Sequence, residues 1–316
     1  MALSLNFYRE PINQILTAGN SSVKLVILNR PRKLNSLNHE MVSQILKNLK
    51  VYESDSSVKL VILKGNGKGF CAGGDVISVV SSSLTGHWTY PVKFYEKQLI
   101  LDHLAATYKK PLVCLINGVV MGGGAGLSMN STFRIVTEKA VFAMPEASLG
   151  FFVDVGASYF LSRLPGYFGE FLGLTGARLD GIEMTACGLA THFVHSTKLN
   201  ALEDALQAIT SSNVLTIAAL IKTFTEKPTV RRDSPFKRDY NIASHILKRT
   251  LSNDFYEGSR AKLFEKDNKP KWEPSKVELV SEEMVDQHFR NINDDEWEPL
   301  QLPQRSDPPI IITCRL

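Results

Sequence analysis

The residues best suited to chemistry in this chain lie within residues 117–156. A glycine run, Gly122 to Gly124 with Gly126, is followed by two carboxylates, Glu146 and Asp154. Glycines let backbone N–H groups approach a ligand closely, and such donors stabilise the oxyanion that forms when a carbonyl is attacked. A carboxylate among apolar residues has a raised pKa and can act as a base near neutral pH. This combination indicates acyl chemistry, such as reaction at a thioester.

A second loop with glycines follows an earlier apolar, strand-like run and occupies residues 65–75. It is not a dinucleotide fingerprint, because Phe70 stands where G-x-G-x-x-G requires a glycine. The N–H groups near Ala72 and Gly73 can instead point at a ligand oxygen, so that the two loops supply one donor each to an oxyanion hole. A plain turn, or tight packing of a helix on a sheet, explains either loop taken alone.

Glu146 and Asp154 are the candidate catalytic carboxylates. Pro145 fixes the backbone before Glu146, and Asp154 interrupts the apolar run at residues 149–155. A helix cap or a salt bridge is the alternative for each carboxylate by itself, whereas the pair directly after a glycine loop favours catalysis. Serine hydrolase chemistry is disfavoured, because Ser128 does not lie in a G-x-S-x-G motif.

The elements that must position these residues alternate between strands and helices. Strand-like apolar runs occupy residues 23–28, 58–63, 111–116, 133–136 and 140–143, and helical spacing marks residues 41–49, 93–108, 201–223 and 242–263. The run Ser36-Leu37-Asn38 can cap the first helix. Strands that alternate with helices predict an α/β fold with a largely parallel sheet. We predict a core at residues 1–199, a C-terminal helical region at residues 200–300 and an exposed tail at residues 301–316.

Composition excludes several classes of protein. The chain has 316 residues, a net charge of +4 and a pI of about 8.7, well short of the basic balance of a nucleic-acid-binding protein. No apolar run has the length of a membrane-spanning helix, so we expect no membrane partner. The four cysteines and seven histidines show no metal-ligand spacing, so we expect free thiols and no metal site.

The C-terminal residues Cys314-Arg315-Leu316 resemble the S-K-L peroxisomal address. The preceding proline-containing tail would expose them, so we expect a peroxisomal protein with an import receptor as partner. Cytoplasm and mitochondrion are the alternative locations.

The motifs together resemble the crotonase superfamily, the enoyl-CoA hydratase/isomerase proteins. The resemblance rests on Gly69-Phe-Cys-Ala-Gly-Gly-Asp75, Met121-Gly-Gly-Gly124 and Met144-Pro-Glu146. Phe151-Phe-Val-Asp-Val-Gly156 and Lys271-Trp-Glu-Pro274 are similar to the 3-hydroxyisobutyryl-CoA hydrolases within that superfamily. The resemblance implies a spiral of repeated ββα units with C-terminal helices, and an acyl-CoA substrate that itself contains coenzyme A, with no separate cofactor. Assembly into a homo-oligomer is a further possible partner interaction that the resemblance leaves open.

The resemblance also assigns roles to residues. The thioester carbonyl would sit between the N–H groups of Ala72 or Gly73 and of Gly123. Gly74, Asp75 and Gly122 would border the substrate, with coenzyme A near the first loop. Glu146 would attack the thioester or activate water, and Asp154 would orient the substrate hydroxyl or the water.

Two positions and one shortened segment separate the reactions of the superfamily or depart from its pattern. Hydratases carry a glutamate where this chain has Gly126, so the resemblance favours hydrolysis of 3-hydroxyisobutyryl-CoA in valine breakdown. Gln98 stands where the hydrolases have a glutamate near the substrate, which leaves the acyl group open. The family also has several tens more residues between the regions of Thr223 and Tyr240, so the C-terminal region is shortened. An isomerase reaction and a non-catalytic CoA-binding protein are the alternatives.

Overall fold

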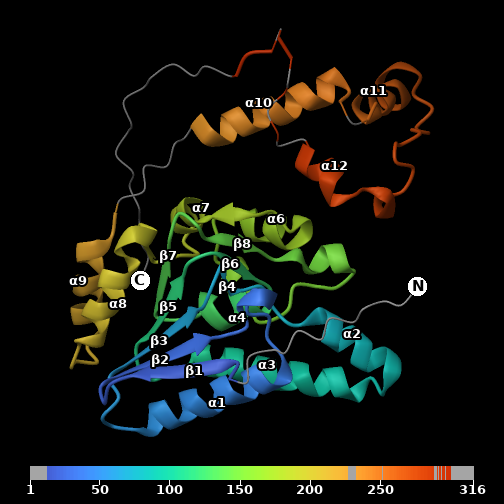
Figure 1. Cartoon of the computed structure of the whole chain (residues 1–316). Coiled ribbons are helices and arrows are strands. Elements are labelled where there is room, and N and C mark those ends of the chain that lie inside the picture. Colours follow the sequence, from blue (N-terminus) through green and yellow to red (C-terminus); the bar gives the residue numbers. More distant parts are fainter. Residues whose placement is uncertain are drawn as a thin grey trace, which may run out of the picture. The chain divides into compact units, whose positions relative to one another are not determined.

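The computed structural model of the chain describes residues 13–226, 233–250 and 252–287, with residues 290, 292, 294, 295 and 297–299. The chain forms two units that divide between Val230 and Arg231. Figure 1 labels the helices and strands. The tail at residues 301–316, with the tripeptide Cys314-Arg315-Leu316, lies outside the described residues.

The strands of the first sheet are buried on both faces, which explains their continuous apolar sequences. Leu60 and Ile62 pack into one apolar cluster, whereas Val61 and Leu63 pack into another on the opposite face. The strand order is β1-β2-β3-β5-β7-β10, and every pair except β1 with β2 is parallel. The strands are β1 (Ile15–Gly19), β2 (Val23–Leu28), β3 (Leu60–Gly65), β5 (Leu112–Ile116), β7 (Phe133–Val136) and β10 (His192–Phe193).

A second, shorter sheet alternates with the first along the chain. Its order is β4-β6-β8-β9, with β4 (Gly69–Cys71), β6 (Val119–Met121), β8 (Val141–Ala143) and β9 (Leu179–Asp180). β4 follows β3, β6 follows β5 and β8 follows β7, and a helical segment comes after each pair. This repeat is the ββα unit that the family resemblance implies. Because β4, β6 and β8 are parallel neighbours, the loops after them meet at one edge of the sheet.

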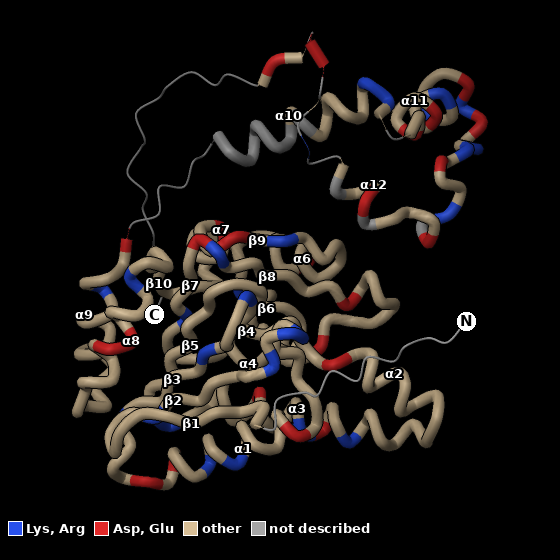
Figure 2. Tube along the Cα trace, in the orientation of Figure 1, with Lys and Arg blue, Asp and Glu red and all other residues tan. Residues whose placement is uncertain are grey.

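The helices of the first unit begin where the sequence supplies caps. Asn38 Oδ1 accepts a hydrogen bond from the N–H of Met41 at 2.9 Å, as expected for the cap of α1. The helices are α1 (His39–Ser54), α2 (Val76–Thr85), α3 (Thr89–Ala106), α4 (Gly123–Met129), α5 (Ala157–Leu161), α6 (Phe168–Thr175) and α7 (Gly181–Ala186). Neither α2 nor α4 contains a charged residue (Figure 2).

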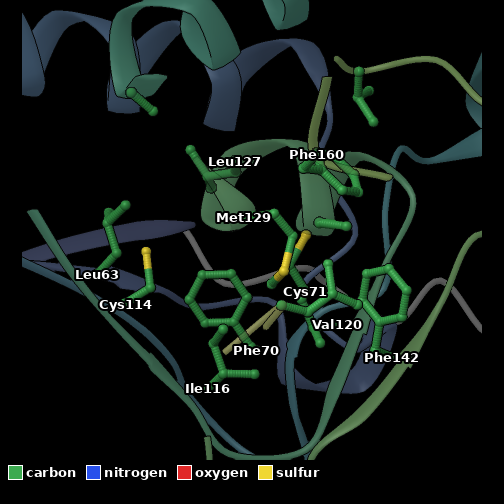
Figure 3. Packing of buried hydrophobic residues seen from close by; sticks show 14 of the residues in the cluster. Leu63, Phe70, Cys71, Cys114, Ile116, Val120, Leu127, Met129, Phe142 and Phe160 are labelled. Atoms are coloured by element: carbon green, nitrogen blue, oxygen red, sulfur yellow. The ribbon is translucent and has the colours of Figure 1, made fainter. Parts of the chain in front are cut away.

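The main core fills the space between the two sheets and around α4. Figure 3 shows Phe70 close to Ile116, with Leu127 and Met129 of α4 above them in this view. Phe70 is 1% exposed and Ile116 fully buried. A short, apolar α4 is therefore held on several sides at once, which fixes the glycine loop at its start.

The boundary of the core lies later than the sequence analysis placed it. We expected the helical region to begin after residue 199, but α8 (Leu199–Gln207) and α9 (Val214–Phe224) belong to the first unit. Leu202, Leu206, Ile217 and Ile221 of these helices join the apolar cluster on the outer face of the first sheet. Since that face is as apolar as the inner one, it needs a helical layer, and α8 and α9 provide it (Figure 1).

The second unit consists of helices in the part that the structure describes. They are α10 (Asp233–Lys248), α11 (Asp254–Ser259), a π-helical turn at Arg260–Phe264, a 3₁₀ turn at Val277–Leu279 and α12 (Glu282–Gln287). Arg260 makes ion pairs with Glu257, Glu265 and Asp267 within this unit. Ion pairs around Arg260 therefore connect neighbouring segments of this unit.

Three general findings apply to the described residues. Cys71, Cys114 and Cys187 are free thiols. None of the helices there combines the length and the apolar character needed to cross a membrane. No group of three or more histidine, cysteine, aspartate or glutamate side chains there is arranged to hold a metal ion.

Replacing Gly124 with alanine should destabilise the protein by about 3 kcal/mol, because a Cβ at Gly124 would lie 2.2 Å from the carbonyl oxygen of Cys71. Gly173→Ala is a matched control inside α6, where the new Cβ meets Val153 at an ordinary 3.5 Å. Denaturant unfolding of both variants measures the difference. Equal stabilities for the two variants would show that α4 can move away from β4.

Candidate active site

The two glycine loops touch each other at the edge of the second sheet. β4 and β6 are parallel neighbours, so the loops that follow them leave the sheet side by side. A Cβ on Gly123 would lie 3.3 Å from the nitrogen of Gly74, and a Cβ on Gly73 would lie 3.2 Å from the carbonyl oxygen of Met121. Gly73 also has φ +104°, a conformation that glycine adopts readily. Side chains at these positions would separate the loops.

The hydrogen bonds of the loops show which N–H groups are available to a ligand. The N–H of Ala72 donates to the carbonyl of Leu34 at 2.9 Å, and the N–H of Gly122 donates to Ala143 at 3.3 Å. Within residues 13–226, no acceptor lies in hydrogen-bond reach of the N–H groups of Gly73, Gly74 and Gly123. The structure therefore removes Ala72 from the predicted oxyanion hole, because its donor is already used. Gly74, expected only to border the substrate, offers a donor beside Gly123.

Glu146 lies in the 3₁₀ turn at Pro145–Leu149, directly after β8. Its residue is 8% exposed, and its Oε2 has no hydrogen-bond partner among the described residues. A Cβ on Gly122 would lie 2.8 Å from Glu146 Oε1, so the missing side chain at Gly122 gives the carboxylate its place beside the loop. Burial raises the pKa of Glu146 to about 7, and the negative charge of Asp154 adds to the shift. A carboxyl with this pKa suits a base near neutral pH.

Asp154 follows Glu146 in the loop that leads to α5. It is half-buried, and burial raises its pKa above the usual value for aspartate. The next residue, Val155, is buried at 2% exposure and has φ +48°, a strained conformation for a β-branched residue. Since such strain persists only where the surroundings enforce it, the packing of Val155 fixes the backbone that carries Asp154.

Val155 also explains why position 126 has no side chain. A Cβ on Gly126 would lie 2.5 Å from the Cβ of Val155 and 3.0 Å from Asp102 Oδ2. The space that a side chain at 126 would need is therefore already filled by Val155 and Asp102. Of the two carboxylates predicted to act together, Asp154 bears a charge that adds to the raised pKa of Glu146.

One face of α3 supplies site residues that the sequence analysis missed. Tyr95 is stacked on Phe151, with ring centroids 5.8 Å apart. Burial raises the pKa of Tyr95, and the charges of Asp154 and Glu146 add to the shift. Tyr95, Gln98 and Asp102 follow the i, i+3, i+7 spacing of one helical face, which is the signal that points to them.

Gln98 was predicted to contact the substrate, and it is buried at 2% exposure on that face. Asp75 was predicted to do the same, but its carboxylate is largely engaged. Oδ2 of Asp75 forms an ion pair with Arg30 at 3.0 Å, and Oδ1 accepts from the N–H of Ser78 at 3.2 Å. Burial raises the pKa of Asp75, but the hydrogen bonds from Arg30 and Ser78 and the charge of Arg30 outweigh it, so the pKa is lowered.

A cavity of about 590 Å³ lies beside Asp75 and the start of α3. Most of the exposed surface of its wall is apolar and includes Leu37, Val79 and Phe94, while Glu40 and Asp75 also line it. The Cβ position of Gly74 lies 3.4 Å from the Phe94 ring, which places the cavity next to the free N–H groups. The site thus offers two adjacent donors for a carbonyl oxygen, a carboxylate of raised pKa, and an apolar cavity alongside.

Comparisons with known proteins agree with this geometry. A family model described as enoyl-CoA hydratase/isomerase matches residues 23–237 and 229–289. A protein from Arabidopsis thaliana named probable 3-hydroxyisobutyryl-CoA hydrolase 3 is 41% identical over 364 residues, covering 93% of this chain and 96% of the relative. A protein from Danio rerio named 3-hydroxyisobutyryl-CoA hydrolase, mitochondrial, is 35% identical over 85% of this chain and 87% of the relative.

The fold has a solved counterpart as well. The crystal structure of a carnitinyl-CoA dehydratase from Mycobacterium thermoresistibile matches with a TM-score of 0.61 and 29% identity, covering 89% of this chain and 97% of that chain. The alignment with the Arabidopsis relative spans more than the 316 residues of this chain. Some residues of the relative are therefore aligned with gaps in this chain. Stacked ββα units, paired glycine loops and these matches together show that the chain belongs to the enoyl-CoA hydratase/isomerase family.

Proposed function

We propose that the protein is an acyl-CoA thioester hydrolase that converts 3-hydroxyisobutyryl-CoA and water to 3-hydroxyisobutyrate and coenzyme A. The observation that carries the proposal is the buried carboxyl of Glu146, which is held against Gly122 with its Oε2 unpaired in the described structure. The names of the Arabidopsis and Danio rerio relatives support the substrate. A role in valine breakdown is the corresponding prediction.

The thioester carbonyl would accept hydrogen bonds from the N–H groups of Gly74 and Gly123. These donors stabilise the negative charge that develops on the oxygen when the carbonyl carbon is attacked, and one such donor is worth about 10²–10³ in rate. The apolar cavity beside Asp75 would take the arm of coenzyme A next to this point. Gly73 remains a further donor, because its N–H has no acceptor among residues 13–226.

Glu146 would supply the attack in one of two ways. As a general base it takes a proton from water, whose oxygen bonds to the acyl carbon while the carbon–sulfur bond breaks and the proton passes to the thiolate. As a nucleophile its carboxylate oxygen bonds to the acyl carbon while the carbon–sulfur bond breaks, which releases coenzyme A as a thiolate that takes a proton. Water then hydrolyses the resulting anhydride to the free acid and the carboxylate of Glu146. Asp154 would orient the hydroxyl of the substrate or the water. Hydration of a double bond is disfavoured, because Val155 fills the space for a second carboxylate at Gly126.

The location of the protein is a separate proposal. The name of the Danio rerio relative contains the word mitochondrial, which fits one of the alternatives that the sequence leaves open. The peroxisomal proposal depends on Cys314-Arg315-Leu316 alone. A fluorescent reporter that carries the tail should enter peroxisomes and should lose that location when the three residues are deleted. Mitochondrial staining of the full chain, unaffected by the deletion, would refute the peroxisomal proposal.

Substituting Glu146 with glutamine should lower thiol release from 3-hydroxyisobutyryl-CoA by about 10²–10⁴-fold, because an amide can neither take the proton nor attack the carbonyl well. A thiol-reactive dye measures the release. Glu170→Gln, a matched change at an exposed glutamate of α6, should leave the rate unchanged. If wild-type protein instead isomerises an unsaturated acyl-CoA without releasing thiol, the hydrolase proposal fails.

The pH dependence of the reaction should report the ionisation of Glu146. The reactive form is the carboxylate, so kcat/KM should fall tenfold per pH unit on the acid side, with half its maximum near pH 7 because the pKa of Glu146 is raised to about 7. Initial rates between pH 5 and pH 9 test this. An acid limb near the ordinary glutamate pKa of about 4.3 would mean that Glu146 is solvated in the working enzyme.

A further inference from the structure

Another cavity of the first unit lies beside the C-terminal half of α3. Its volume is about 620 Å³, which is within the range of small-molecule sites. Residues of α3, the end of α4, β7 and α5 line it, and most of its exposed lining is apolar, including Leu99, Met129, Phe160 and Leu164. None of its lining residues is a candidate catalytic carboxylate or belongs to the two glycine loops. The cavity is therefore separate from the cavity beside Asp75.

Arg134 of β7 is half-buried and lines this cavity. Its Nε donates to the carbonyl of Leu189 at 2.6 Å, and its Nη1 donates to the carbonyl of Ser131 at 2.7 Å. In the part of the chain that the structure describes, Nη2 has no acceptor. Burial lowers the pKa of Arg134, because removal from water disfavours the charged form. The two carbonyl groups thus fix the guanidinium in place without neutralising its charge.

Arg163 brings a second positive charge to the same cavity. Its guanidinium carbon lies 3.3 Å from the centre of the Tyr159 ring, and its Nη1 donates to the Tyr159 carbonyl at 2.7 Å, so the side chain is held against α5. Among the described residues, no carboxylate forms an ion pair with Arg134 or Arg163. Asp102 also lines the cavity, but burial raises its pKa well above the usual value, which favours its uncharged form.

Two arginines without acidic partners in the described chain leave this cavity positively charged. A charge that is partly removed from water is costly unless an opposite charge accompanies it. Guanidinium groups bind carboxylates through paired N–H donors, and both arginines keep unused donors. The apolar remainder of the lining favours a hydrocarbon body over a bare inorganic anion. A small aliphatic carboxylate satisfies both parts of the cavity.

We propose that this cavity is a second ligand site, which binds a small aliphatic carboxylate with its charge against Arg134 and Arg163. The proposal does not depend on the proposed hydrolysis, because the lining contains neither Glu146 nor a residue of the two glycine loops. Val155 and Gly156 also line the cavity. Since they directly follow Asp154, a ligand bound here contacts the segment that carries that carboxylate.

The experiment measures binding of isobutyrate to the full chain by calorimetry, at constant ionic strength and with coenzyme A present in excess to occupy the candidate active site. Isobutyrate should bind with a Kd of about 1 mM or tighter. Isobutyramide has the same shape without the charge, and phosphate has the charge without the hydrocarbon body, so each should bind at least about tenfold more weakly. No saturable binding of isobutyrate, or equal binding of isobutyramide or phosphate, would overturn the proposal.

Variants locate the bound carboxylate. Arg163→Gln should weaken isobutyrate binding by about 10–100-fold, because a charged hydrogen-bonding partner is lost. Arg134→Lys should weaken it by about tenfold, since an ammonium group does not reproduce the planar fork of donors. Arg178→Gln is the matched control at an exposed arginine outside the lining. Equal affinities in Arg163→Gln, Arg134→Lys and Arg178→Gln would place the ligand elsewhere and refute this site, whatever the outcome of the thiol-release assay.

Discussion

The candidate site depends on how closely the start of α4 approaches the end of β4. Gly124 lies so near the Cys71 carbonyl that a single methyl group would sit 2.2 Å from it. This approach brings the nitrogens of Gly74 and Gly123 to the same place, although the two residues come from different ββα units. Gly122 of the same loop then lies beside the carboxylate of Glu146, with no side chain between the two. One contact between backbones therefore places two donors and one carboxylate together, and the apolar core around α4 holds that contact rigid.

Burying the carboxylates opposes stability while it prepares the chemistry. The pKa of Glu146 is raised from the ordinary range to about 7, so the folded state favours the protonated form. The corresponding stability is fully present below pH of about 4.3 and is lost as the pH rises through about 7, where the reactive carboxylate forms. The strained backbone at Val155 acts in the same direction. Apolar packing on both faces of the first sheet supplies the stability that offsets the buried carboxylates and the strained backbone.

Local patterns in the sequence predict the parts of the structure that depend on neighbours along the chain. The apolar runs, the Asn38 cap and the glycine loops all lie where their sequences place them, and Glu146 lies beside the second loop. Ala72 was wrong as an oxyanion donor because its acceptor, Leu34, is distant in sequence. The burial of Asp102 was missed as well, since it depends on residues distant along the chain such as Gly126, which lies close to its carboxyl. The end of the core was misplaced because the outer face of the sheet recruits two more helices.

The absence of a side chain at Gly126 is a matter of volume as well as charge. A Cβ at Gly126 would lie 2.5 Å from the Cβ of Val155 and 3.0 Å from Asp102 Oδ2, so the site has no room for a glutamate side chain. A carboxylate introduced at this position would displace Val155, which sets the backbone of Asp154, and would place a second acid beside Asp102. The three residues thus exclude the hydratase arrangement jointly. The room for a side chain at position 126 therefore depends on how the loop before α5 packs on α4.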